Sequence, residues 1–243
     1  MNLEQTRSRS VGMVVKCIAL MGLVAAVLFT SCNRQKTSKD FDTPNDTVKA
    51  NVKKGVKPVA DTDVAVIEAE DPAYGKIVIE LYSNVAPKMV ERFKKLIAEG
   101  FYDGTSFHRI DTDLGIIQGG DPLSKDNEPE NDGTGSSPYP DVPSEFSDIM
   151  YERGVVGAAR QGERPGLTEV QAWDTANCQF YITLKRQPAF DQQYTVFGRV
   201  ISGINDADII AHAPVAPGTE RPLTRIAIKR VTLQPRSNYS KGS

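Results

Sequence analysis

The stretch FHRIDTDLGIIQGGDP, residues 107–122, is the part of the sequence that decides the fold. It places a charged residue, Arg109, inside an apolar run that resembles a β-strand. The chain then returns through a second apolar run to Gln118 and the glycine pair 119–120. Polar side chains on an apolar floor are typical of a small recognition pocket.

An ion pair is a simpler explanation of Arg109. A guanidinium in a half-buried strand is usually satisfied by a carboxylate, which here would be Asp111 or Asp121. The neighbouring residues favour a pocket instead, because two consecutive glycines allow another backbone to approach closely. Gln118 also offers both a donor and an acceptor beside the guanidinium. Both explanations stay open at this point.

Two further motifs lie downstream, CQFYITL at 178–184 and YTVFGRVISG at 194–203. Together with FHRI and IIQGGDP, and in this order, they resemble the cyclophilins, the peptidyl-prolyl cis/trans isomerase family. The similarity runs from about Val64 to about Leu233. Relative to the family, residues 124–132 are interpreted as an insertion.

The periodicity of apolar residues predicts a series of strands and two helices. Many antiparallel strands with two helices suit a closed barrel with helical caps. The resemblance implies a mainly β fold of this kind, a closed eight-stranded antiparallel β-barrel capped by two helices. The expected strands are 64–70, 76–82, 107–110, 114–118, 154–159, 179–184, 194–201 and 223–233, and the expected helices begin at Pro87 and Ile204.

Residues 1–31 are interpreted as an export signal. Basic residues precede an unbroken apolar run at 17–29, which has the length of a secretory signal and is short for a membrane span. The run ends in LFTSC, which resembles the lipobox of bacterial lipoproteins. We therefore expect lipidation of Cys32, with an ordinary cleaved signal and a chance cysteine as the alternative.

A lipid on Cys32 would attach the protein to a membrane without a transmembrane helix. Asn33 follows in place of an acidic residue, which by resemblance to lipoprotein sorting signals indicates the outer membrane of a Gram-negative-type cell envelope. We expect the domain to face the periplasm.

Three further segments follow the signal. Residues 32–62 are rich in Lys, Asp, Thr, Asn and Pro, and we expect a flexible tether because such a segment buries little apolar surface. Residues 63–234 are the expected folded domain and 235–243 a short tail.

Charge and cysteine content exclude some classes of function. The net charge of −2 and the absence of a long basic run give no support to nucleic-acid binding. Of the three cysteines, Cys17 lies in the signal and Cys32 is the expected lipidation site. Cys178 would then be alone, so no intramolecular disulfide is expected. A monomer is the default expectation.

The resemblance implies an isomerase that acts on X–Pro bonds of exported proteins. Rotation about such a bond crosses a barrier of about 18–20 kcal/mol. No bond is made or broken, so no nucleophile, metal or cofactor is needed, and the site must favour the twisted amide over both planar forms. By the resemblance, Arg109 donates a hydrogen bond to the proline nitrogen and Gln118 holds the substrate backbone.

The same resemblance implies a set of residues that line the pocket or bind the neighbouring peptide. Without the family, each of them would be interpreted as a plain core or strand residue. They are Phe107, Leu114, Ile116, Ala159, Arg160, Gln179, Tyr181, Phe190 and Tyr194.

The chain departs from the family pattern around this pocket. One extra residue separates Arg109 from Gln118, and Gly115 replaces the usual aromatic residue. Ala189 stands where the family often has a large ring. These departures favour an alternative function, a catalytically weak module that binds proline-containing chains as a chaperone. A hydrolase has little support, because no Gly-x-Ser-x-Gly turn is present.

Overall fold

A computed structural model describes residues 50–162 and 165–239. The predicted export signal, Cys32, the predicted tether up to residue 49 and residues 240–243 of the predicted tail lie outside the described residues. No helix within the described ranges is long and apolar enough to cross a membrane.

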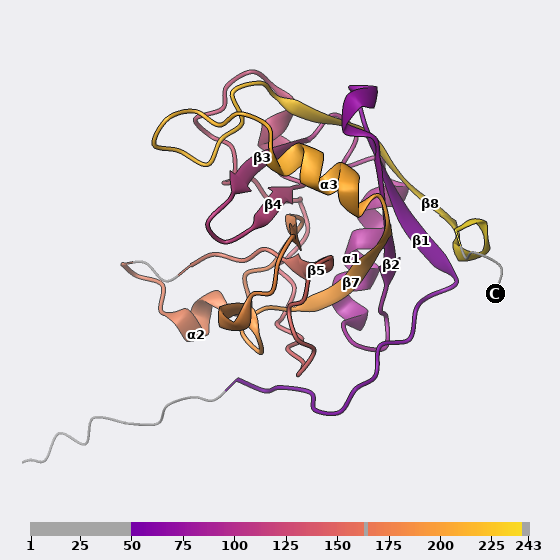
Figure 1. Cartoon of the computed structure of the whole chain (residues 1–243). Helices are drawn as coiled ribbons and strands as arrows, with labels where there is room; N and C mark the ends of the chain where they lie inside the picture. The colour runs from indigo at the N-terminus through magenta and orange to yellow at the C-terminus, as the bar shows by residue number, and fades with distance from the viewer. Residues whose placement is uncertain (1–49, 163–164, 240–243) are drawn as a thin grey trace, which may run out of the picture. The chain divides into compact units, whose positions relative to one another are not determined.

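Eight strands in the described residues form a closed barrel in the order β1-β2-β7-β5-β6-β4-β3-β8 (Figure 1). Every neighbouring pair is antiparallel, and β1 pairs with both β2 and β8. The predicted eight-stranded barrel is therefore confirmed. The strands are β1 (Asp63–Ala69), β2 (Lys76–Leu81), β3 (Ser106–Asp111), β4 (Ile116–Gly119), β5 (Val155–Ala158), β6 (Phe180–Thr183), β7 (Val196–Ser202) and β8 (Ile226–Pro235).

The described residues contain three α-helices, one more than the sequence predicted. The two expected helices are α1 (Pro87–Ala98) and α3 (Ile204–Ala211). The third is α2 (Glu169–Ala172), a single turn that begins with a capping box between Thr168 and Gln171. One turn is too short to show an apolar period, so the pattern could not predict it. Short 3-10 turns are η1 (Pro72–Tyr74), η2 (Pro122–Lys125), η3 (Pro188–Phe190) and η4 (Arg236–Asn238).

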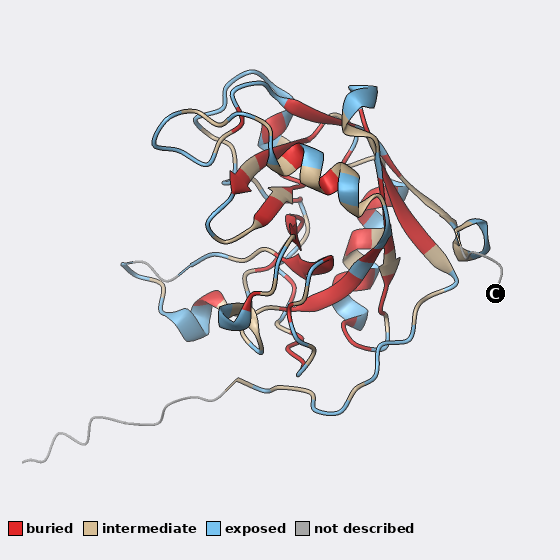
Figure 2. Cartoon of the chain, in the orientation of Figure 1, coloured by how far each residue is buried: buried red, intermediate tan, exposed pale blue. Residues whose placement is uncertain are grey.

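Helix α1 packs one apolar face into the core. Phe93 is fully buried, and its ring lies 5.1 Å from Tyr102, 5.6 Å from Phe180 and 5.2 Å from Phe197, measured between ring centroids. Figure 2 shows the buried residues gathered on the strands and on one side of α1. The first backbone N–H groups of a helix have no acceptor within the helix. In α1 the Glu145 carboxylate, which lies outside the helix, accepts hydrogen bonds from two of them.

The prediction that the flexible tether extends to residue 62 is wrong for residues 50–62. Lys53 pairs with Ser147 in a parallel bridge, and its ammonium donates to the Val85 carbonyl at 2.8 Å. Val56 and Ala60 pack on the apolar cluster that contains Val85. The sequence suggested flexibility because the segment has few large side chains, but backbone pairing and a few small contacts hold it against the domain.

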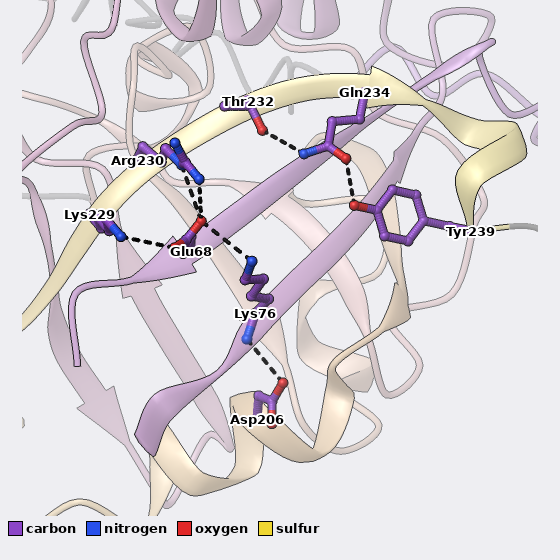
Figure 3. Close-up of polar contacts among 8 residues, drawn as sticks. All are labelled: Glu68, Lys76, Asp206, Lys229, Arg230, Thr232, Gln234 and Tyr239. Carbon is purple, nitrogen blue, oxygen red and sulfur yellow. Dashed lines mark hydrogen bonds and ion pairs between the residues drawn. The ribbon is translucent and has the colours of Figure 1, made fainter. Parts of the chain in front are cut away.

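Residues 235–239 cover part of the outer face of β1, β2 and β8 (Figure 3). Tyr239 packs against the valine cluster of β1 and β2, which includes Val78, and its hydroxyl donates to Gln234 at 2.7 Å. Residues 235–239 of the predicted tail therefore belong to the fold. They also explain why Val78 is buried although it lies on the outward face of β2.

Away from Tyr239 on the same face of the sheet, the Glu68 carboxylate on β1 pairs with three cations (Figure 3). The ammonium groups of Lys76 and Lys229 lie at 3.5 and 3.2 Å, and the Arg230 guanidinium at 2.9 Å. Hydrogen bonds from Arg230 and then Lys229 lower the pKa of Glu68 to about 2. This cluster links β1, β2 and β8 at the seam of the barrel.

Replacement of Glu68 by Gln is expected to destabilise the fold in a pH-dependent way. A lowered folded-state pKa contributes stability above the unfolded pKa, near 4.5, and this contribution is lost as the pH falls towards 2. Urea denaturation should show a parent–variant difference in unfolding free energy that is constant near pH 7 and shrinks between pH 4.5 and 2. Glu70→Gln, at an exposed position nearby, is the control, and a pH-independent difference for Glu68→Gln would contradict the assignment.

Candidate functional site

A bulge in β3 sets the direction of Arg109. Phe107 pairs with Gly119 and Arg109 pairs with Gln118, so His108 is an extra residue opposite a single step of β4. Without the bulge, Phe107 and Arg109 would point to the same face of the sheet. With it, Phe107 points into the barrel and Arg109 shares the outer face with Gln118.

Four residues now lie directly opposite one another across four adjacent strands. Arg109 on β3 faces Gln118 on β4, Gln118 faces Tyr181 on β6, and Tyr181 faces Gly157 on β5. Directly opposite positions in antiparallel strands place their side chains in contact. We call this set the Arg109–Gly157 row.

Arg109 is held by three different groups. Its Nη2 donates to Asp111 at 2.8 Å, its Nη1 donates to the Gln118 side-chain oxygen at 3.2 Å, and its Nε donates to Glu220. A guanidinium has five N–H donors, and the other two have no partner among the described residues. The predicted ion pair with Asp111 is confirmed, whereas Asp121 instead accepts backbone N–H groups of the following loop.

A chain of side-chain amides connects the row to the long loop after β4. Gln118 donates to the Gln179 side-chain oxygen at 2.9 Å. Gln179 in turn donates to the carbonyls of Gly133 and Gly135 at 3.1 and 2.9 Å. Each amide has a partner on both sides, so its orientation is fixed.

An apolar wall lies beside the amide chain. Tyr181 is its centre, with the rings of Tyr151, Phe190 and Tyr194 at 5.9, 5.5 and 5.9 Å between centroids. Leu114, Ile116 and Ala159 belong to the same cluster. Tyr181 and Ile116 are nearly covered, whereas Leu114, Ala159, Phe190 and Tyr194 are half-buried and form the accessible rim.

Gly157 makes room for the tip of the Tyr181 ring. A side chain at Gly157 would bring its Cβ within 2.5 Å of the Tyr181 hydroxyl oxygen and 2.7 Å of the Tyr151 hydroxyl oxygen. Burial raises the pKa of both tyrosines above the usual range, so both stay neutral. The wall is therefore uncharged.

Next to the wall lies a cavity of about 490 Å³. Its lining includes Gln118, Gln179, residues 133–136 and Arg160. The Arg160 guanidinium stacks over the Tyr194 ring at 4.5 Å and donates to the Gln193 carbonyl at 3.3 Å. The cavity is thus bounded by the amide chain on one side and by the cation–π pair on the other. No group of three or more His, Cys, Asp or Glu side chains in the described part of the chain is placed to hold a metal ion.

Comparison with known proteins agrees with this geometry. Residues 64–233 match the family model of the Cyclophilin type peptidyl-prolyl cis-trans isomerase/CLD. The chain belongs to the cyclophilin family. A protein of Brucella suis biovar 1 named "Probable peptidyl-prolyl cis-trans isomerase" is 39% identical over 140 residues, which cover 56% of this chain and 66% of the relative. The chain therefore spans slightly less than two thirds of that relative.

Two other similar proteins are covered more completely. Peptidyl-prolyl cis-trans isomerase-like 3 of Gallus gallus is 36% identical over 165 residues, 65% of this chain and 90% of the relative. The crystal structure of a Cryptosporidium parvum cyclophilin type peptidyl-prolyl cis-trans isomerase, in the presence of the dipeptide Ala-Pro, matches with a TM-score of 0.59 and 26% identity. This match covers 70% of this chain and 98% of that chain.

The cyclophilin domain brings together nearly all the predicted site residues, and Phe107 is the exception. Its ring is buried in the barrel core, 6.2 Å from the Phe180 ring between centroids, on the face of β3 opposite to Arg109, and its role in substrate binding stays a prediction. The bulge at His108 is the physical reason. The extra residue sends Phe107 and Arg109 to opposite faces.

Two of the three departures from the family pattern, at Gly115 and Ala189, have different surroundings. At Gly115 the space of a side chain is already filled, since a Cβ there would lie 2.7 Å from the Lys185 Cγ. Ala189 is exposed in η3 and leaves the rim beside Phe190 open.

Sequence reasoning missed Glu220 in the cyclophilin site. It lies in the loop between α3 and β8, and its carbonyl accepts a hydrogen bond from the Ile110 N–H at 2.6 Å while its carboxylate binds Arg109. Glu220 is separated from Arg109 by 111 positions and belongs to no motif, so no local signal could have indicated it.

Substitution of Gly157 by Ala is expected to displace the Tyr181 ring. Overpacking of this kind costs about 1–3 kcal/mol, and a shifted wall should raise KM for a proline peptide. Thermal unfolding and peptide isomerisation kinetics would measure both effects. Gly162→Ala is the control for thermal unfolding alone, because a Cβ at Gly162 meets nothing within 4 Å but Gly162 lines the cavity. Equal thermal unfolding of the two variants would show that Gly157 does not make room for the ring.

Proposed function

We propose that this cyclophilin domain accelerates cis/trans isomerisation of X–Pro bonds in exported proteins at the cell envelope. The observation that carries the proposal is the Arg109–Gly157 row. It places a guanidinium with two unpaired N–H donors beside a neutral, apolar wall. A proline ring requires such a wall, and a twisted amide requires such a donor.

The proposed mechanism is preferential binding of the twisted amide. Rotation about the X–Pro bond localises the lone pair on the proline nitrogen, because amide resonance is lost. Arg109 donates to this lone pair through one of its unpaired N–H groups. Since the donor is charged and already oriented by Asp111, Gln118 and Glu220, it stabilises the transition state more than either planar form.

In this mechanism the Gln118 side chain also binds the client backbone while the X–Pro bond rotates. Its side chain is fixed between Arg109 and Gln179, so it offers a prearranged contact at little entropic cost. The client residues next to the proline then lie in the cavity of about 490 Å³. The solved relative crystallised in the presence of Ala-Pro supports a proline-containing ligand for this fold.

A second candidate function is a chaperone module that binds proline-containing chains with little turnover. The observation that supports it is the small accessible area of the apolar wall, since Tyr181 and Ile116 are only 3% and 2% exposed. A wall with little accessible apolar area binds the proline ring weakly, so less binding energy is available to stabilise the transition state.

Replacement of Arg109 by Ala decides between the two functions. For an isomerase, loss of a prearranged donor should lower kcat/KM by about 10²-fold or more, while the binding of the client changes little. The measurement is NMR exchange between the cis and trans forms of a short Xaa-Pro peptide, with the 33–243 protein. Arg199→Ala, at an exposed position of β7, is the control. A folded parent without any acceleration would favour the chaperone module.

We also propose that the protein is anchored by a lipid on Cys32 in the outer membrane, with a monomeric domain in the periplasm. The support is the apolar run at 17–29 and the lipobox-like sequence before Cys32. The tether from Cys32 to the first described residue would keep the domain close to newly exported chains.

Substitution of Cys32 by Ala is expected to release the protein from the membrane. Without an acyl chain the buried hydrocarbon that supplies membrane affinity is lost. Labelling with a fatty-acid analogue and fractionation of the envelope would show this directly. Cys178→Ala, a change at a fully buried thiol, is the control and should keep the label. Unaltered labelling of Cys32→Ala would exclude lipidation at this position.

A further inference from the structure

A second cavity, of about 370 Å³, lies on the other side of the loop that borders the first. Gly133 lines the first cavity and its neighbour Asp132 lines the second. The second cavity has apolar walls from Pro129, Pro222 and Leu223. We call it the flank pocket. It is formed in part by residues of the segment 124–132, which we interpreted from the sequence as an insertion relative to the family.

The flank pocket adjoins the catalytic guanidinium on two sides. His108, which lines it, directly precedes Arg109 in β3. Arg221, which also lines it, directly follows Glu220, the residue that binds the Arg109 Nε. Two residues that line the flank pocket are therefore direct sequence neighbours of Arg109 and of Glu220.

Two polar groups in the flank pocket lack partners. The His108 side chain is 7% exposed, and neither ring nitrogen makes a hydrogen bond of good geometry among the described residues, although the Ser106 backbone lies nearby. The Asp132 carboxylate is half-buried, and no hydrogen bond or ion pair to it is formed within the described residues. A buried polar group without a partner costs free energy unless a ligand satisfies it.

The arginines that line the flank pocket are already engaged. Arg221 donates to the Glu130 carboxylate at 2.8 Å, and Arg225 donates to the Ser124 carbonyl at 2.9 Å and to the Gly104 carbonyl. Burial, and then the charge of Asp121, raises the pKa of Asp132, although both arginines oppose the shift.

His108 is held in its neutral form. Burial is the main cause that lowers its pKa, and the charge of Asp121 and the Ser106 backbone oppose the shift only in part. A neutral imidazole has one donor and one acceptor nitrogen. The flank pocket thus offers a carboxylate and an imidazole acceptor between apolar walls.

We propose that the flank pocket receives a basic side chain, Lys or Arg, of the client chain whose proline occupies the isomerase site. The methylene stem packs between Pro129, Pro222 and Leu223, as long cationic side chains commonly do on apolar surface. The charged tip donates to Asp132 and to the acceptor nitrogen of His108. The proposal rests on the proposed isomerase function and names the client chains that it prefers.

The test compares peptides that carry Lys or norleucine, an uncharged side chain of similar length, at each of the two positions on either side of proline. The readout is the ratio of kcat/KM for the Lys peptide to that for the norleucine peptide. At one position the parent should prefer Lys by about fivefold, the size expected for a partly exposed ion pair. In Asp132→Asn this ratio should fall towards one.

Glu128→Gln is the matched control. It removes a carboxylate from the same loop, but Glu128 is exposed and does not line the flank pocket. The proposal is overturned if the parent turns over both peptides equally at every position, which would leave the isomerase function intact. It is also overturned if Glu128→Gln lowers the ratio as much as Asp132→Asn, because a long-range charge effect would then explain the preference.

A binding measurement tests the proposal even if the parent shows no turnover or the Asp132→Asn variant does not fold. In the parent, the ring resonances of His108 should shift on addition of the preferred Lys peptide and stay in place with the norleucine peptide. A shift without turnover would contradict the proposed isomerase function alone. Equal responses to both peptides would overturn the flank pocket as a site for basic side chains.

Discussion

The site depends on one extra residue in β3. A regular strand would bury Arg109 beside Phe107 in a core of aliphatic and aromatic side chains, where a guanidinium is costly. The bulge at His108 turns Arg109 to the outer face, opposite Gln118, and leaves Phe107 inside. The pairing register then continues through Tyr181 to Gly157 without any loop, so the rigid part of the barrel positions the chemistry.

Two loops contribute hydrogen-bond acceptors to the two sides of the Arg109–Gly157 row. The loop after β4 supplies the carbonyls that hold Gln179, and the loop after α3 supplies Glu220. Asp121 keeps the first of these loops in shape, because its carboxylate accepts backbone N–H groups from residues up to 14 positions away. These long loops have a structural role in the site, because each of them contains the last acceptor of a hydrogen-bond chain that starts at Arg109.

Much of this architecture could be predicted from the sequence, because the barrel strands and the two longer helices leave periodic apolar patterns. The motifs also indicated Arg109, Gln118, Gln179 and Tyr181, which lie on strands that pair with one another. Local patterns could not reveal the bulge, since Phe-His-Arg fits a regular strand equally well. They could not reveal Glu220 or the packing of residues 50–62 either, because both depend on contacts between distant parts of the chain.

The closed order of the strands has a consequence for the proposed action on unfolded client chains. Extended chains bind readily to the unpaired edge of a sheet, and such strand addition is a common route to aggregation. In the described barrel β1 pairs with β8 as well as with β2, so the sheet offers no edge of this kind. A client can therefore contact the row of side chains on the outer face and leave again, without its backbone being captured as a ninth strand.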